Sequence, residues 1–215
     1  MKSWINKTKI HWQDKSFLIM LFTSLLFLLL SFVVNFYAGT YASEKASQSV
    51  TDIVLSNTRA YDVDGIFIYG PFILWIFVAA FTIYEPKRIP FTLKSIALFL
   101  VVRSVFISLT HIGPFPGDPT GAIVQGSALI KRFTFGADLF FSAHTGLPYL
   151  MALTFWDHVF MRWALVITSI FFGIVVLLGH YHYSIDVLSA FFITYSIFHI
   201  ALHIFKKDRE LFMRP

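Results

Sequence analysis

The chain has 215 residues, of which 57% are hydrophobic and 13% are charged, and its formal net charge is +5. Soluble domains average about 25% charged residues, so the composition excludes an ordinary soluble protein and indicates a polytopic membrane protein. Cysteine is absent, which excludes a disulfide framework, a thiol nucleophile and a thiolate metal site.

Six apolar segments are candidates for membrane-spanning helices, each of which needs about 20 residues. They are Phe17–Ala38, Ile66–Tyr84, Phe91–Ile112, His144–Trp156, Trp163–Gly179 and Ser184–Phe205. The fourth is short, and we expect it to begin near Ala137. The first has no small-residue cleavage site behind it, so we interpret it as a retained span and not a signal peptide. The sequence predicts an all-α bundle of six transmembrane helices over residues 17–205, between a segment 1–16 and a basic tail 206–215.

Two longer connections interrupt this pattern. The polar segment Gly39–Gly65 is expected to carry a short surface helix around Ser47–Leu55. The segment Gly113–Ala137 begins Gly-Pro-Phe-Pro, which cannot be helical because proline lacks an amide donor and has a fixed φ. It could form a rim or a lid.

The orientation follows from the distribution of Lys and Arg in the short loops. Most of these residues fall on one side of a six-span chain: Lys2, Lys7, Lys9, Lys15, Lys87, Arg88, Lys94, Arg162, Lys206, Lys207, Arg209 and Arg214. The other side carries Lys45, Arg59, Lys131 and Arg132. We therefore expect both termini to be cytoplasmic. The net positive charge is explained by topology, and a nucleic-acid partner is not expected.

Two stretches place ionisable groups at the ends of consecutive apolar helices, both on the predicted non-cytoplasmic side. One runs from Asp138 to Gly146 and contains His144, and the other runs from Gly179 to Val187 and contains His180, His182 and Asp186. Ionisable groups inside a membrane are costly and are functional candidates by default. These stretches therefore predict an active site at a membrane surface.

Residues His182 and Asp186 are four apart and would share one helix face. A carboxylate there can hold one imidazole nitrogen and leave the other free to attack phosphorus, which gives a phosphohistidine intermediate. His144 can protonate the leaving alcohol. Amides at the helix start near His144 and the guanidinium of Arg103, within the third span, suit phosphate oxygens.

These residues resemble a known family. Ser142-Ala-His-Thr145 and His182-Tyr-Ser-Ile-Asp186-Val look like the two histidine motifs of sphingomyelin synthases, a branch of the type 2 phosphatidic acid phosphatase (PAP2) superfamily. Asp138 matches that branch, as do Arg103 followed by Thr110 and the pair Pro114-Phe-Pro116. The chain departs from the family patterns at Ala143 and Ser184. It also lacks the Lys-x6-Arg-Pro motif of the wider superfamily. Ile96 stands at the lysine position, seven residues before Arg103, and Ser104 stands at the proline position.

The resemblance implies a role for each motif residue: His182 as nucleophile, Asp186 as its partner and His144 as the leaving-group acid. Arg103, Ser142, Thr145 and Asp138 are the phosphate-binding candidates, and His180 is either a further phosphate ligand or only part of the loop. No cofactor and no metal is expected. A zinc site built from His111, His144, His180 and His182 is the less favoured alternative, because their spacing fits no known metal pattern.

The leading hypothesis is an enzyme that moves or removes a phosphorylated lipid headgroup at the exoplasmic face of a membrane, which we expect to be the bacterial inner membrane. Its partners would be a phospholipid donor and, as acceptor, diacylglycerol, ceramide or water. Transfer and hydrolysis stay equally open. The alternatives are a transporter, which predicts charges spread through the depth of the bundle, and a catalytically inactive lipid-binding relative, which predicts a lost motif residue.

Overall fold

The computed structural model describes residues 12–116 and 139–213, and the regular secondary structure within these ranges is entirely helical. Five helices are long and apolar enough to cross a membrane: α2 Lys15–Glu44, α4 Asp64–Tyr84, α5 Ile89–Leu109, α9 Val159–Leu178 and α10 Ser184–Ile204. Shorter helices are α3 Ile53–Ser56, the 3₁₀ turn η1 Pro86–Arg88, α8 Ala143–Thr154 and α11 Lys206–Met213. Over the described residues the fold is all-helical, and its long apolar helices fit a multi-pass membrane protein, as the composition predicts.

The fourth predicted span differs from the expectation. Helix α8 has 12 residues and begins at Ala143, where Ser142 is its N-cap with an extended backbone (φ −62°, ψ 124°). The expectation of a helical start near Ala137 is wrong, because residues 139–142 are not helical. At about 1.5 Å per residue, α8 is too short to cross a bilayer alone. The count of six spans and the cytoplasmic location of the termini stay predictions.

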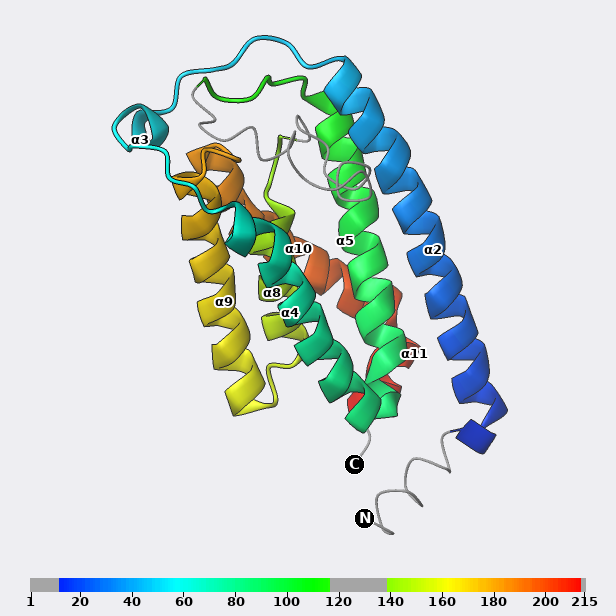
Figure 1. Cartoon of the computed structure of the whole chain (residues 1–215). Helices are drawn as coiled ribbons and strands as arrows, with labels where there is room; N and C mark the ends of the chain where they lie inside the picture. The colour runs from blue at the N-terminus through cyan, green and yellow to red at the C-terminus, as the bar shows by residue number, and fades with distance from the viewer. Residues whose placement is uncertain (1–11, 117–138, 214–215) are drawn as a thin grey trace.

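The helices form a bundle in which α2 packs along α5, while α8 packs against both α9 and α10 (Figure 1). On α2 the buried side chains include Ser24 and Ser31, whose small size lets the two backbones approach, as is usual between membrane helices. The main core surrounds α8, with Leu150, Met151 and Phe99 fully or almost fully buried. Helix α8 is thus the short central element of the bundle.

The connection between α2 and α4 mostly lacks regular secondary structure. It contains α3, which begins at Ile53 and not near Ser47 as expected, because residues 46–52 are not helical. The segment pairs with the residues after α5: the amide of Ser47 donates to the carbonyl of His111 (2.7 Å), and the amide of Gly113 donates to the carbonyl of Gln48 (3.2 Å). A Cβ at position 113 would lie 2.1 Å from the Ser47 carbonyl oxygen, so this close approach requires glycine.

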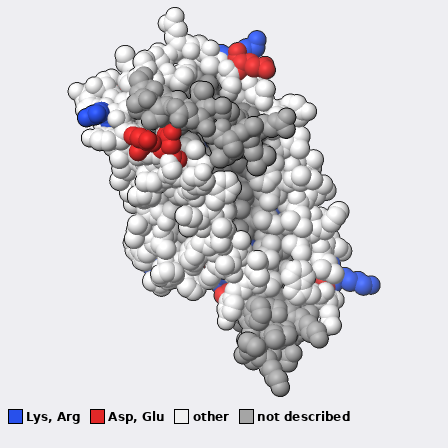
Figure 2. All heavy atoms as spheres, viewed as in Figure 1, with Lys and Arg blue, Asp and Glu red and all other residues white. Residues whose placement is uncertain are grey.

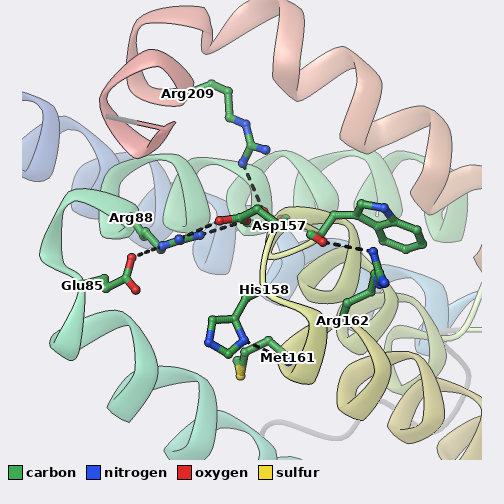
Figure 3. A network of polar contacts seen from close by, with 9 residues as sticks. Glu85, Arg88, Asp157, His158, Met161, Arg162 and Arg209 are labelled. Carbon is green, nitrogen blue, oxygen red and sulfur yellow. Dashed lines mark hydrogen bonds and ion pairs between the residues drawn. The ribbon is translucent and has the colours of Figure 1, made fainter. Parts of the chain in front are cut away.

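Ion pairs join the helices at the opposite end, where α11 lies (Figure 3). The guanidinium of Arg88 binds both carboxylate oxygens of Asp157 (3.0 and 2.7 Å) and also contacts Glu85. On α11, Arg209 donates to the carbonyl of Thr154 (3.1 Å). These contacts tie η1 and α11 to the turn after α8. Between the two ends, the face in Figure 2 is almost free of charged side chains, as expected for a surface in contact with lipid.

Candidate active site

The first turn of α10 carries a pre-formed histidine–carboxylate pair. Nδ1 of His182 lies 3.2 Å from Oδ2 of Asp186, and the backbone amide of Tyr183 donates to the same oxygen (3.0 Å). The contact from the Tyr183 amide to the Asp186 side chain is the N3-to-N-cap bond of a capping box at the helix start. Asp186 is 0% exposed and His182 is 6% exposed. The carboxylate therefore fixes the ring of His182, as the four-residue spacing predicts, and Nε2 is the ring nitrogen turned away from it.

The start of α8 lies against this turn. The amide of Ser142 donates to the backbone carbonyl of Asp186 (3.0 Å), which joins the two sequence motifs directly. Ser142 and Thr145 are fully buried. Their hydroxyl oxygens have no hydrogen-bond partner among the described residues. A buried hydroxyl without a partner is costly, so these two oxygens are available for a ligand.

His144 is held by α4. Its Nε2 lies 3.1 Å from the carbonyl oxygen of Phe67, and the two rings stack with centroids 4.2 Å apart. Because a carbonyl only accepts, Nε2 carries a proton and Nδ1 is the ring nitrogen whose protonation can change. His182 and Arg103 both interact electrostatically with His144. The structure therefore brings together the three predicted residues His144, His182 and Arg103.

Arg103 lies on α5 and is 3% exposed. Its Nε donates to the carbonyl of Phe141 (3.3 Å), just before the Ser142 motif. Among the described non-glycine residues, only Phe141 (φ 21°) and His180 (φ 56°) have positive φ. Such conformations cost about 1–3 kcal/mol each and gather at functional sites. Phe141 directly precedes Ser142, and His180 lies two residues before His182. The strained backbone therefore lies beside the motif residues and is held there by the surrounding structure.

His180 faces the connection between α2 and α4. Its Nε2 lies 3.1 Å from the carbonyl of Thr58, and its ring packs edge-on against Phe115. A phosphate-binding role for His180 stays a prediction. Asp138 lies outside the described residues. In the described part of the chain, no three His, Cys, Asp or Glu side chains are placed to hold a metal ion.

Two neighbouring apolar cavities lie along α4, and the smaller one is lined by His144. The larger cavity, of about 550 Å³, lies between α4 and α9 and is lined by residues that include Tyr69, Ile73 and Phe171. A smaller cavity of about 80 Å³ is lined by Pro148 and His144 itself. Leu74 and Phe172 form walls of both cavities. His144 therefore borders the smaller cavity, which is separated from the larger one between α4 and α9 by these two shared walls.

Three contacts of the site were not predicted from the sequence. Phe67 supplies the carbonyl that holds His144, and the hydroxyl of Tyr181 donates to the carboxylate of Asp64. Asp52 accepts hydrogen bonds at the start of α10. Asp52 before Ile-Val-Leu was a readable N-cap signal for α3. Nothing in the sequence pointed to its contact with α10.

Taken together, the helices and the paired motifs define a multi-pass membrane protein in which buried histidine, arginine and aspartate side chains of the two motifs and of α5 gather at one end of the bundle. Residues 136–204, which contain both histidine motifs and helices α8 to α10, match the family model described as PAP2 superfamily C-terminal. This match supports membership of the PAP2 superfamily, and the superfamily predicted from the two motifs is confirmed. The superfamily comprises phosphatases and phosphotransferases. Comparison with curated proteins and with solved structures gave no match.

Proposed function

We propose that this protein transfers or removes the phosphorylated headgroup of a membrane lipid through a phosphohistidine on His182. The observation that carries the proposal is the buried His182–Asp186 pair, joined through Ser142 to the start of α8. Such a pair has the base-and-orienter geometry of a nucleophilic site, with histidine itself as the nucleophile.

In the first step Nε2 of His182 attacks the phosphorus atom. A P–N bond forms while the P–O bond to the leaving alcohol breaks, and the positive charge that develops on the ring is stabilised by Asp186. The leaving oxygen takes a proton from His144, whose Nε2 stays on the Phe67 carbonyl while Nδ1–H donates.

In the second step an acceptor hydroxyl attacks the phosphohistidine. His144, now neutral at Nδ1, removes the proton of that hydroxyl, a new P–O bond forms and the P–N bond breaks. Water as acceptor gives hydrolysis, and diacylglycerol or ceramide gives headgroup transfer. The sphingomyelin synthase-like branch of the superfamily, favoured by the Asp138 and Arg103 pattern, is the transferase form of this proposal.

Phosphate binding is assigned to residues around the start of α8. Arg103 supplies a buried guanidinium, which suits phosphate in bidentate fashion, and the hydroxyls of Ser142 and Thr145 supply further donors. The start of α8 leaves backbone amides without partners inside the helix, and such amides favour an anion. His180 and Asp138 complete the proposed set.

A lipid substrate is favoured over a soluble phosphate ester by the apolar groove between α4 and α9, which shares the walls Leu74 and Phe172 with the smaller cavity at His144. The groove volume of about 550 Å³ lies in the range of typical ligand cavities, about 300–1,000 Å³. The groove opens between α4 and α9, two of the apolar helices, so an acyl chain could remain in a hydrocarbon environment while the phosphate reaches His182.

The test is a paired assay on purified protein in lipid. A headgroup-labelled phospholipid is supplied with and without added diacylglycerol or ceramide, and wild type is compared with His182→Ala. His199→Ala is the matched control, because His199 is an exposed histidine on the same helix, away from the site.

Four outcomes are distinguishable. Label that moves to the acceptor, and is lost only in His182→Ala, supports transfer. Free phosphate or phosphorylated headgroup that appears without any acceptor, again lost only in His182→Ala, supports hydrolysis. Equal turnover in wild type and His182→Ala would show that the nucleophile is wrongly assigned, and the absence of turnover in both would favour a transport function.

We further propose that the site faces the non-cytoplasmic side of the inner membrane. Because the chain has no native cysteine, single-cysteine variants can be labelled cleanly from one side. Asn57→Cys, in the exposed turn after α3 near the site, should react with an impermeant maleimide in intact cells. Lys207→Cys, at an exposed position of α11, should react only after the cells are broken. The reverse pattern would place the site on the cytoplasmic face.

A further inference from the structure

Asp52 forms hydrogen bonds with two helix starts that are far apart in the sequence. Its Oδ1 accepts from the amides of Val54 (2.8 Å) and Leu55 (3.0 Å), which caps α3. Its Oδ2 accepts from the amide of Ser184 (2.7 Å), the first residue of α10. Asp52 is 7% exposed. One buried carboxylate thus satisfies amide donors at both helices, which otherwise lack partners at a helix start.

The negative charge of the Asp52 carboxylate strengthens its hydrogen bonds with the two helix starts. Burial opposes ionisation of Asp52, but the hydrogen bonds from Leu55, Ser184 and Val54 outweigh it and lower the pKa of the carboxyl. The group is therefore ionised at neutral pH and interacts favourably with the positive end of α10. Hydrogen bonds to charged groups are stronger than neutral ones.

A second contact from the segment around Asp52 holds Tyr183, the residue before Ser184. The amide of Val50 donates to the Tyr183 hydroxyl (3.2 Å), and that hydroxyl donates to the carbonyl of Gly113 (2.8 Å). Tyr183 and Ser184 directly follow His182. The segment around Asp52 therefore holds two consecutive residues beside the proposed nucleophile.

We propose that Asp52 is a positioning residue for the reaction, which holds the first turn of α10 so that His182 and Asp186 keep their attacking geometry. This inference rests on the proposed function of His182. His182 lies just before the helix, where its own backbone is not fixed by helical hydrogen bonds. Its ring direction therefore depends on Asp186 and on the backbone of Tyr183 and Ser184. Loss of the Ser184 contact would free that backbone without removing any group that touches the substrate.

The test variant is Asp52→Ser. A serine oxygen can still cap α3, as serine is a good N-cap, but its single short hydroxyl cannot also reach Ser184. The matched control is Asp14→Ser, because Asp14 caps α2 through Ser16 and is exposed at the opposite end of the bundle. Asp52→Asn is the second variant, since its amide offers one acceptor oxygen where the carboxylate offers two.

Two measurements are made on the full chain in lipid nanodiscs. Hydrogen–deuterium exchange over residues 182–187 should become about tenfold faster in Asp52→Ser, the effect of losing one charge-assisted hydrogen bond. The rate of phosphoenzyme formation on the labelled phospholipid should fall by about 10- to 100-fold, with KM changed less than about threefold. Asp52→Asn, which also keeps a single acceptor oxygen, should show changes in the same directions, and Asp14→Ser should show neither.

The proposal is overturned by unchanged exchange over residues 182–187, by exchange that rises equally throughout the bundle, or by wild-type turnover despite faster local exchange. A loss of activity that disappears when rates are normalised to folded protein overturns it as well. If wild type itself has no turnover on any phospholipid tested, the proposed function fails. The exchange data then decide by themselves whether Asp52 holds the start of α10.

Discussion

The carboxylate of Asp186 lies 3.2 Å from Nδ1 of His182 and is completely buried. The same oxygen accepts the amide of Tyr183, so the pair is fixed to the helix backbone and does not depend on side-chain packing alone. A buried histidine whose one nitrogen is held by a carboxylate has a defined tautomer and a defined direction of attack.

Replacing Asp186 with Asn should therefore reduce phosphoenzyme formation by about 10²–10⁴-fold while KM changes little, because the ring loses its orientation and its charge partner. The measurement is the single-turnover rate on a labelled phospholipid. Ser196→Ala, an exposed serine on the same helix, should retain the wild-type rate. Wild-type rates in Asp186→Asn would contradict the assigned role of the carboxylate.

The close packing around Gly146, in the Ser142 motif, predicts that a larger residue there destabilises the protein. A Cβ at Gly146 would lie 2.7 Å from the ring of Phe99 and 2.8 Å from the hydroxyl of Thr194. Gly146→Ala should destabilise the protein by about 1–3 kcal/mol, the usual cost of overpacking. Gly65→Ala is the control, because a Cβ added at Gly65 would have no atom within 4 Å. Thermal unfolding in detergent should show a lower Tm for Gly146→Ala alone.

The ion pair between Arg88 and Asp157, at the end of the bundle where α11 lies, predicts that the stability of the protein depends on pH. Burial opposes ionisation of Asp157, but the hydrogen bonds and charge of Arg88 hold the pKa of its carboxyl below the usual range. A carboxyl with a lowered folded-state pKa adds stability above its unfolded pKa of about 3.9, and this stability is lost as the pH falls through the folded value.

Wild type should therefore lose thermal stability as the pH falls below about 4, and Asp157→Asn should lose less over that range because it starts from a lower stability at neutral pH. Unfolding curves recorded at several pH values check this. Glu210→Gln, at an exposed position on α11, should follow the wild-type curve. An equally steep acid loss in Asp157→Asn would remove Asp157 as its source.

The groove between α4 and α9 predicts a chain-length effect that depends on the proposed function. Ile73→Trp should narrow the cavity and raise KM for a long-chain phospholipid by about 10-fold, within the 1–3 kcal/mol typical of hydrophobic pocket changes. A short-chain analogue should be affected less. Ile174→Trp is the control, since Ile174 is exposed on α9 and lines neither cavity. Equal effects on both chain lengths would argue against an acyl-chain site.

The sequence by itself predicted the membrane class, the five long helices and the motif residues. Runs of about 20 apolar residues specify spanning helices locally, because lipid leaves no other partner for their backbone groups. The four-residue spacing of His182 and Asp186 is likewise a local property of a helix, and the observed contact agrees with it.

Only the tertiary structure decided how the two motifs meet. The hydrogen bonds from Ser142 to Asp186 and from Ser184 to Asp52 join residues 44 and 132 positions apart, and the carbonyl of Phe67 holds His144 across 77 positions. The sequence also did not predict that α8 begins at Ala143 or that Lys206–Met213 forms the helix α11. Local patterns indicate the long apolar helices, but short helices and contacts between distant segments depend on how the helices pack, and that packing is a property of the whole bundle.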